Sequence, residues 1–183
     1  MNLPNKLTLI RIAMIPVFLF FLMTEFVPYS IYIALAVFVV AAATDALDGH
    51  IARSRGLVTD FGKFADPLAD KILVLSALIG LIELGQIGAI PVIIIIAREF
   101  MVTGLRIVAI GSGKVIAAGL SGKLKTVLQM IVTVLLMVIC PFRAEVFALE
   151  VIAQIGIWAM VAITVYSGAE YIIQNWSIID YRK

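Results

Sequence analysis

The chain has 183 residues, of which 63% are hydrophobic and 14% are charged, and its formal net charge is +2. This composition, with a mean hydropathy of +1.13, lies well outside the range of ordinary soluble domains and predicts an integral membrane protein. The single cysteine, Cys140, excludes a disulfide framework and a cysteine-based metal site.

Apolar runs recur along the whole chain at lengths typical of membrane helices. A run of about 20 residues crosses a hydrocarbon core of roughly 30 Å as a helix. The six predicted helices cover residues 7–24, 29–49, 65–83, 87–110, 124–141 and 146–173. Because no long linker, low-complexity run or internal repeat separates them, we expect a single all-α transmembrane domain over residues 1–183.

Basic residues predict the orientation of these helices. They gather near both termini and around the second and fourth connections, whereas the opposite connections hold Arg143 together with Glu25, Glu83 and Glu145. Cytoplasmic loops of membrane proteins collect Lys and Arg. We therefore expect a multi-pass protein of the cytoplasmic membrane, surrounded by membrane lipids, with both termini and the second connection on the cytoplasmic side.

Four acids stand out in the stretch DALDGHIARSRGLVTDFGKFADPLAD. Asp45 and Asp48 are spaced i, i+3 at the end of the second predicted helix, and Asp66 and Asp70 are spaced i, i+4 at the start of the third. The short connection places these helices side by side, so the carboxylates converge. Since an unpaired acid in a membrane helix costs about 2.5–3.5 kcal/mol, cations must neutralise them. Oxygen ligands without His or Cys suit Mg²⁺, Mn²⁺ or Ca²⁺, and four acids predict a pair of ions about 3.5–4 Å apart.

Small residues flank these acids. Gly49 and Ala52 share the face of the first acid pair and leave a shallow groove in which a phosphate backbone could lie close to the helix. Arg53 projects from the same side, and Gly62 stands one turn before Asp66. The arrangement predicts a metal-bound diphosphate with a slot for a base.

The complete pattern from Asp45 to Asp70, D-x2-D-G-x2-A-R-x8-G-x3-D-x3-D, resembles without departure the signature of the CDP-alcohol phosphotransferases. The resemblance implies transfer of a phosphatidyl group from CDP-diacylglycerol to a small alcohol with release of CMP, two Mg²⁺ or Mn²⁺ ions as cofactors, and a homodimer. It implies that the four acids hold the ions and that Asp70 is also the general base, since a carboxylate must accept the alcohol proton. The implied donor-binding residues are Asn5, Thr8, Gly49, Ala52, Arg53 and Gly62.

A second group of charges points to the acceptor. Arg98 and Arg106 lie on one face of an otherwise apolar helix, and Lys114, Lys123 and Lys125 follow them. Snorkelling to the lipid headgroups fits Lys114 and Lys125 but not Arg98, which lies near the middle of its helix. Because Arg binds phosphate in a bidentate manner, the pattern favours an anionic acceptor. The predicted acceptor phosphate ligands are Arg98, Arg106, Lys123 and Lys125.

Three further motifs resemble the family members whose acceptor is sn-glycerol 3-phosphate. They are Asn-x2-Thr-x2-Arg from Asn5 to Arg11, REF-x2-T-x2-R from Arg98, and GKLKT at 122–126. Acceptors of other relatives, inositol phosphate or the phosphatidylglycerol used by cardiolipin synthases, remain alternatives.

A divalent-cation transporter is an alternative of a different class, because intramembrane carboxylates also mark ion pathways. All four acids lie at one side, however, and no acidic relay continues toward Glu83 or Glu145. No nucleic-acid partner is expected. GSGK at 111–114 is not a nucleotide loop, because Val108 and Val115 stand where its pattern needs Gly and Ser or Thr.

Overall fold

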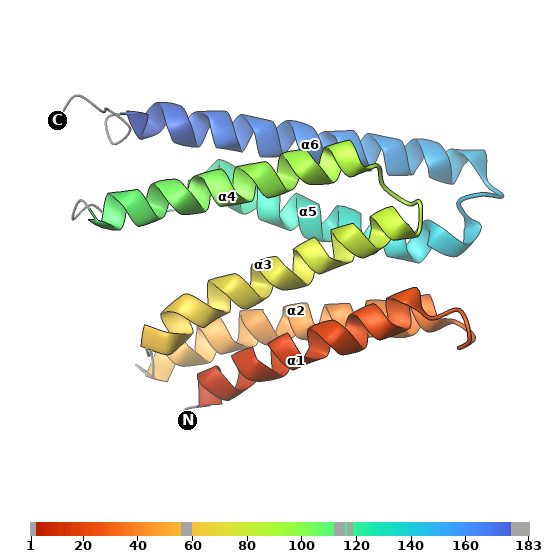
Figure 1. Ribbon diagram of the computed structural model, residues 1–183, viewed down its shortest axis with the longest axis horizontal. Coiled ribbons are helices and arrows are strands. Elements are labelled where there is room, and N and C mark those ends of the chain that lie inside the picture. Colours follow the sequence, from red (N-terminus) through yellow and green to blue (C-terminus); the bar gives the residue numbers. More distant parts are fainter. Residues whose placement is uncertain (1–2, 56–59, 112–115, 117–118, 177–183) are drawn as a thin grey trace. The chain divides into compact units, whose positions relative to one another are not determined.

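The computed structural model describes residues 3–55, 60–111, 116 and 119–176, and among these the side chains of 6–44, 68–111, 116 and 119–176. This part of the chain contains six α-helices, one short 3-10 helix and no strand (Figure 1). The helices are α1 (Leu3–Met23), α2 (Ser30–Arg55), α3 (Asp60–Glu83), α4 (Ala89–Gly111), α5 (Leu120–Ile139), η1 (Cys140–Phe142) and α6 (Phe147–Gln174).

The predicted all-α fold is confirmed, and each predicted helix overlaps an observed one. The largest differences lie around the acidic stretch, where α2 continues to Arg55 rather than ending at residue 49 and α3 begins at Asp60 rather than at residue 65. The predicted ends followed the ends of the apolar runs. A helical backbone satisfies its hydrogen bonds within the helix, so it continues through polar residues where the apolar run has stopped.

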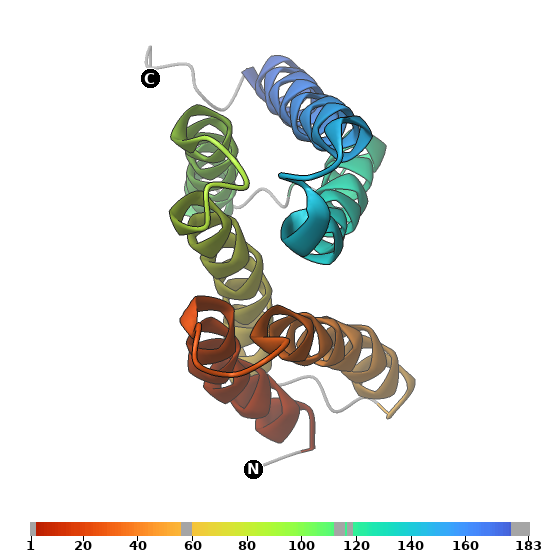
Figure 2. The same cartoon turned by 90° about the vertical axis from the view of Figure 1, so that its right-hand side faces the viewer.

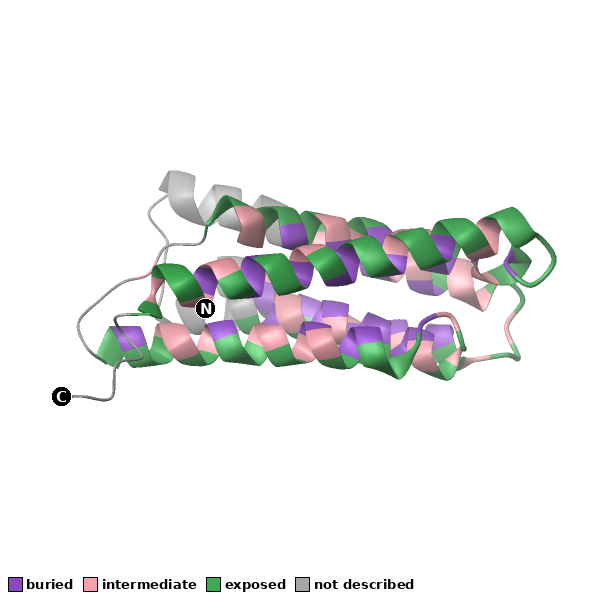
Figure 3. Ribbon diagram, turned by 90° about the horizontal axis from the view of Figure 1, so that it is seen from above, coloured by how far each residue is buried: buried purple, intermediate pink, exposed green. Residues whose placement is uncertain are grey.

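Length and composition identify three segments, among the described residues, that can cross a membrane. They are Lys6–Met23, Leu120–Phe142 and Phe147–Gln174, and α2 adds the shorter apolar segment Ser30–Thr44. Exposed and buried residues alternate along the helices (Figure 3). The exposed ones include large apolar residues such as Phe20, Ile93 and Ile155, as expected for side chains that face lipid. The chain is therefore a multi-pass membrane protein.

The first three helices form one compact unit, Met1–Gln86, in which α1 packs against both α2 and α3 (Figure 2). The rings of Phe18 and Phe38 join α1 to α2, with their centroids 5.6 Å apart. Gly80 brings α3 close to α1, because a Cβ at this position would stand 2.5 Å from Leu22 Cδ2. A small residue therefore sets the α1–α3 spacing, as is common between membrane helices.

The last three helices form the second unit, Ile87–Lys183, in which α6 packs against both α4 and α5. Its core is apolar and includes Ile95 of α4, Leu136 and Met137 of α5, and Met160 of α6, none of which is exposed. Thr133 and Thr164 are also buried, and each donates its hydroxyl to the backbone carbonyl four residues earlier. These hydroxyls therefore add no unsatisfied polar group to the core.

Candidate active site

Two neighbouring helices of the first unit carry the acid motif. Asp45 and Asp48 lie in the last part of α2, Asp66 and Asp70 lie in the first half of α3, and the two helices contact each other. The first pair thus lies in the second half of α2 and the second pair in the first half of α3. The predicted site residues whose side chains lie outside the described part of the chain are Asn5, Asp45, Asp48, Gly49, Ala52, Arg53, Gly62 and Asp66.

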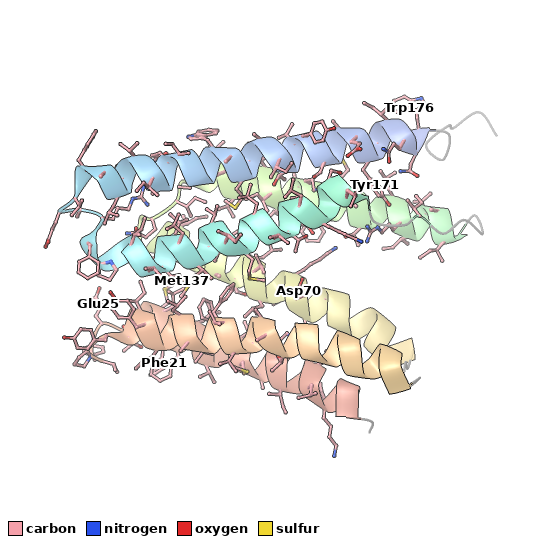
Figure 4. The ribbon with its side chains drawn as sticks, turned by 180° about the vertical axis from the view of Figure 1, so that it is seen from behind. Phe21, Glu25, Asp70, Met137, Tyr171 and Trp176 are labelled. Carbon is pink, nitrogen blue, oxygen red and sulfur yellow. The ribbon has the colours of Figure 1, made fainter. Side chains whose placement is uncertain are left out.

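Asp70 is the acid of the motif whose side chain the structure describes (Figure 4). It is half-buried, next to the fully buried Ala69 and one turn before the buried residues Leu73 and Val74 of α3. A carboxylate at the edge of the buried stripe remains accessible while its backbone is fixed by the packed helix. This position suits a metal ligand or a base that must reach a bound substrate.

Two predicted motif residues of α1 are fully buried, Thr8 and Arg11. Arg11 Nε donates a hydrogen bond of 3.2 Å to the backbone carbonyl of Ala41, which also accepts a 2.7 Å bond from the Thr44 hydroxyl. Ala41 stands one turn before Asp45 in α2. Arg11 thus brings a positive charge to the segment of α2 that leads into the acid motif, a contact that the Asn-x2-Thr-x2-Arg motif did not predict.

In the second unit, the structure brings Arg98 and Lys125 together through Glu99, which belongs to the REF motif but was not among the predicted ligands. Arg98 Nη1 donates to Glu99 Oε1 at 3.0 Å, and Lys125 Nζ donates to the same oxygen at 2.5 Å. The exposed fractions of the Arg98, Glu99 and Lys125 side chains are 11%, 14% and 3%. The snorkelling interpretation is therefore wrong for Lys125, because its ammonium is buried against an acid of α4 instead of extending to the headgroups.

These three residues, called here the α4–α5 charge cluster, carry two positive charges and one negative charge. Arg98 Nε is buried and has no hydrogen-bond partner among the described residues, whereas Nη1 is bound to Glu99. The Nε–Nη2 edge of a guanidinium binds two oxygens of a phosphate or carboxylate at once. The cluster can therefore bind an anion with that edge.

The other two predicted acceptor ligands lie elsewhere in this unit. Arg106 Nε donates to the Tyr171 hydroxyl at 3.3 Å, and the Arg106 Cζ lies 5.7 Å from the centroid of the same ring. Tyr171 therefore holds Arg106 against α6 by a hydrogen bond and a cation–π contact. Lys123 is exposed on the first turn of α5. Tyr171 gave no signal in the sequence, because aromatic residues near helix ends are usually interfacial.

Comparison with known proteins gives consistent matches. A family model described as CDP-alcohol phosphatidyltransferase matches residues 1–166. The CDP-diacylglycerol--glycerol-3-phosphate 3-phosphatidyltransferase of Bacillus subtilis (strain 168) is 44% identical over 97% of this chain and 97% of its own. A protein of the same name from Rickettsia bellii (strain RML369-C) is 39% identical over 93% of each chain. A probable phosphatidylglycerophosphate synthase of Mycobacterium tuberculosis (strain ATCC 25618 / H37Rv) is 41% identical over 93% of this chain and 80% of its own.

Proposed function

The chain belongs to the CDP-alcohol phosphatidyltransferase family, and from that premise we propose that it transfers the phosphatidyl group of CDP-diacylglycerol to sn-glycerol 3-phosphate. The products are phosphatidylglycerophosphate and CMP, so the protein acts as a phosphatidylglycerophosphate synthase in phospholipid biosynthesis. The observation that carries the proposal is the similarity, along nearly the whole length, to a relative whose name states this donor and this acceptor.

The acid motif fits the divalent cations that this family generally uses. Asp45, Asp48, Asp66 and Asp70 supply oxygen ligands from two contacting helices, and their four negative charges balance two divalent ions. We assign these residues as the ligands of two Mg²⁺ or Mn²⁺ ions. When bound, such ions neutralise the diphosphate and the departing CMP.

The chain's own residues orient the donor and move the proton. Asp70 accepts the proton of the attacking acceptor hydroxyl, whose oxygen forms a bond to the phosphatidyl phosphorus as the bond from phosphorus to CMP breaks. The half-buried position of Asp70 supports this role, because the carboxylate is both fixed and accessible. The residues assigned to the donor are Asn5, Thr8, Gly49, Ala52, Arg53 and Gly62.

The α4–α5 charge cluster binds the acceptor phosphate in this proposal. The half-buried Arg98 and the buried Lys125 both donate to one oxygen of Glu99, which brings two cations together at one place in this unit. The unpartnered Arg98 Nε supports binding of phosphate to the Nε–Nη2 edge. Arg106 and Lys123 add positive charge to the same unit, and we assign them as further acceptor ligands.

The membrane arrangement follows from the same proposal. The distribution of Lys and Arg supports a place in the cytoplasmic membrane with both termini and the active site facing the cytoplasm. The family match extends across both compact units, which supports a single catalytic domain over residues 1–183. Family resemblance also implies a homodimer, which mass photometry of the purified protein tests.

The deciding experiment supplies the purified protein with CDP-diacylglycerol and follows CMP release and the lipid product by mass spectrometry. The acceptor panel holds sn-glycerol 3-phosphate, inositol phosphate, phosphatidylglycerol and a control without acceptor, each with Mg²⁺, Mn²⁺ or EDTA. We expect phosphatidylglycerophosphate only with sn-glycerol 3-phosphate and a divalent ion. Turnover with another acceptor would overturn the assigned substrate. No turnover at all, with cation flux into liposomes, would favour a transporter.

A further inference from the structure

The stem of the Arg98 side chain lies beside Gly168 of α6. A Cβ at Gly168 would stand 3.0 Å from Arg98 Cγ and 3.5 Å from Met101 Cε. Ordinary contacts between carbon atoms fall at about 3.5–4.0 Å, so the first of these distances is too short for a relaxed contact. Gly168 is buried, and even a methyl group there would require Arg98 to move.

The other end of Arg98 restricts that movement. Its Nη1 is bound to Glu99, which also holds Lys125, and its Nη2 lies 3.6 Å from the position of a Cβ on Gly122 of α5. The guanidinium is thus held by Glu99 and lies near Gly122 of α5, while the stem lies beside α6. A displacement of the stem is therefore expected to change the position of the guanidinium or its bond to Glu99.

A second glycine of α6 provides the contrast. A Cβ at Gly156 would stand 3.5 Å from Val132 Cγ2, 3.6 Å from Val132 Cγ1 and 3.8 Å from Leu135 Cδ2. These are ordinary van der Waals contacts with apolar side chains. The same Gly→Ala change on the same helix is therefore accommodated at Gly156 but displaces Arg98 at Gly168.

We propose that Gly168 is a positioning residue for acceptor binding: its lack of a side chain lets the Arg98 guanidinium lie where its Nε–Nη2 edge meets the acceptor anion. This inference rests on the proposed function of Arg98 as an acceptor ligand. Gly168 itself contacts no substrate, and it acts only through the position of Arg98.

The kinetic test compares Gly168→Ala with Gly156→Ala in the full-length purified protein. Initial rates of CMP release are measured with sn-glycerol 3-phosphate varied at saturating CDP-diacylglycerol, and then with the donor varied at saturating acceptor. Gly168→Ala should raise the KM for sn-glycerol 3-phosphate about three- to tenfold, with the donor KM and kcat within about twofold of the wild type. Gly156→Ala should match the wild type. Equal acceptor KM values for the two variants would overturn the proposal.

A stability measurement tests the same contact without turnover. Apparent unfolding temperatures in detergent are compared for Gly168→Ala alone, Arg98→Ala alone and the double variant. Gly168→Ala alone should lower the unfolding temperature by about 2–4 °C. With Arg98→Ala present, the Cγ is gone and the same change should no longer destabilise, since Ala favours a helix over Gly.

These variants form a double-mutant cycle. Additive losses of unfolding temperature in the cycle would show that the methyl group does not act through Arg98, and would overturn the proposal. Failure of the proposed function and failure of the proposed role of Gly168 are distinguishable. A wild-type protein that gives no product with sn-glycerol 3-phosphate refutes the proposed function, whereas the cycle still decides whether Gly168 positions Arg98.

Discussion

The charged residues inside the second unit are paired rather than isolated. Arg98 and Lys125 both contact Glu99, and Arg106 contacts the hydroxyl and ring of Tyr171. Removing one partner from a buried charge pair is strongly destabilising, because the remaining charge is left in a low-dielectric environment. Glu99 therefore allows two cations to lie close together in a membrane protein.

Replacing Arg98 with Ala should weaken acceptor use specifically. Loss of a charge-assisted hydrogen bond is worth about 1.5–3 kcal/mol, which corresponds to roughly a ten- to hundredfold lower kcat/KM for sn-glycerol 3-phosphate. Arg98→Lys should restore only part of the loss, since a point charge replaces a planar fork. Kinetic constants for both substrates check this expectation. A defect confined to CDP-diacylglycerol would instead assign Arg98 to the donor.

Replacing Asp70 with Asn should separate chemistry from donor binding. If Asp70 is the proposed general base, its loss should lower turnover by about 10²- to 10⁴-fold. Donor binding should be retained if the three other acids are the proposed metal ligands. Donor binding is measured as the equilibrium affinity for CDP-diacylglycerol in the presence of Mg²⁺, and chemistry is measured as the single-turnover rate. If donor affinity falls in parallel with the rate, Asp70 is chiefly a metal ligand.

At the scale of the element, a left-handed glycine and two backbone hydrogen bonds end α3. Gly85 has a φ of +67°, the Gly85 N–H donates to the Ile82 carbonyl at 2.9 Å, and the Gln86 N–H donates to the Leu81 carbonyl at 2.8 Å. This pair of bonds is the Schellman motif, which satisfies the last carbonyls of a helix and favours glycine at the left-handed position. The start of the loop after α3 is therefore fixed by backbone geometry.

Gly85→Ala should lower the stability of the protein by about 1–2 kcal/mol, because a Cβ in the left-handed region meets the neighbouring carbonyl. The apparent unfolding temperature in detergent checks this. Gly104→Ala is the matched control, since a Cβ at Gly104 in α4 would have no atom within 4 Å. It should be neutral or slightly stabilising through helix propensity. Equal effects of the two changes would contradict a role for the left-handed conformation.

At the scale of the whole molecule, the proposed orientation depends on which connections carry charge. The described connection after η1 contains Arg143, but its guanidinium donates two hydrogen bonds to the Glu150 carboxylate, from Nε at 2.5 Å and from Nη2 at 3.0 Å. The positive-inside rule counts Lys and Arg rather than net charge, so this pairing does not decide the side. The proposed orientation rests on the number of basic residues: Arg143 is the one Lys or Arg of this connection, whereas several lie near both termini.

Cysteine labelling tests this orientation. In a Cys140→Ser background, Lys6→Cys and Glu145→Cys place single thiols at exposed positions near the N-terminus and between η1 and α6. A membrane-impermeant maleimide should label Glu145→Cys in intact bacterial cells and Lys6→Cys only after permeabilisation. Labelling of Lys6→Cys in intact cells, with Glu145→Cys protected, would reverse the proposed orientation.

The sequence by itself determined the helical fold, the approximate helix positions and the acid motif with its family. These features are local: the length of an apolar run sets a membrane helix, and spacings of three or four residues place acids on one helix face. The helix ends around the acidic stretch were less accurate, because a helix continues as long as its backbone hydrogen bonds are made, whatever the polarity of its side chains.

The tertiary structure alone decided which charges meet. In the sequence, Lys125 fitted either snorkelling or acceptor binding, whereas the structure buries it on Glu99 of another helix. The contact of Arg106 with Tyr171 joins α4 to α6, and Gly168 of α6 leaves room for the stem of Arg98. Such contacts depend on the rotation and spacing of packed helices, to which residues far apart in the sequence contribute jointly. Local periodicity gives the face on which a residue lies, but only helix packing determines what lies opposite that face.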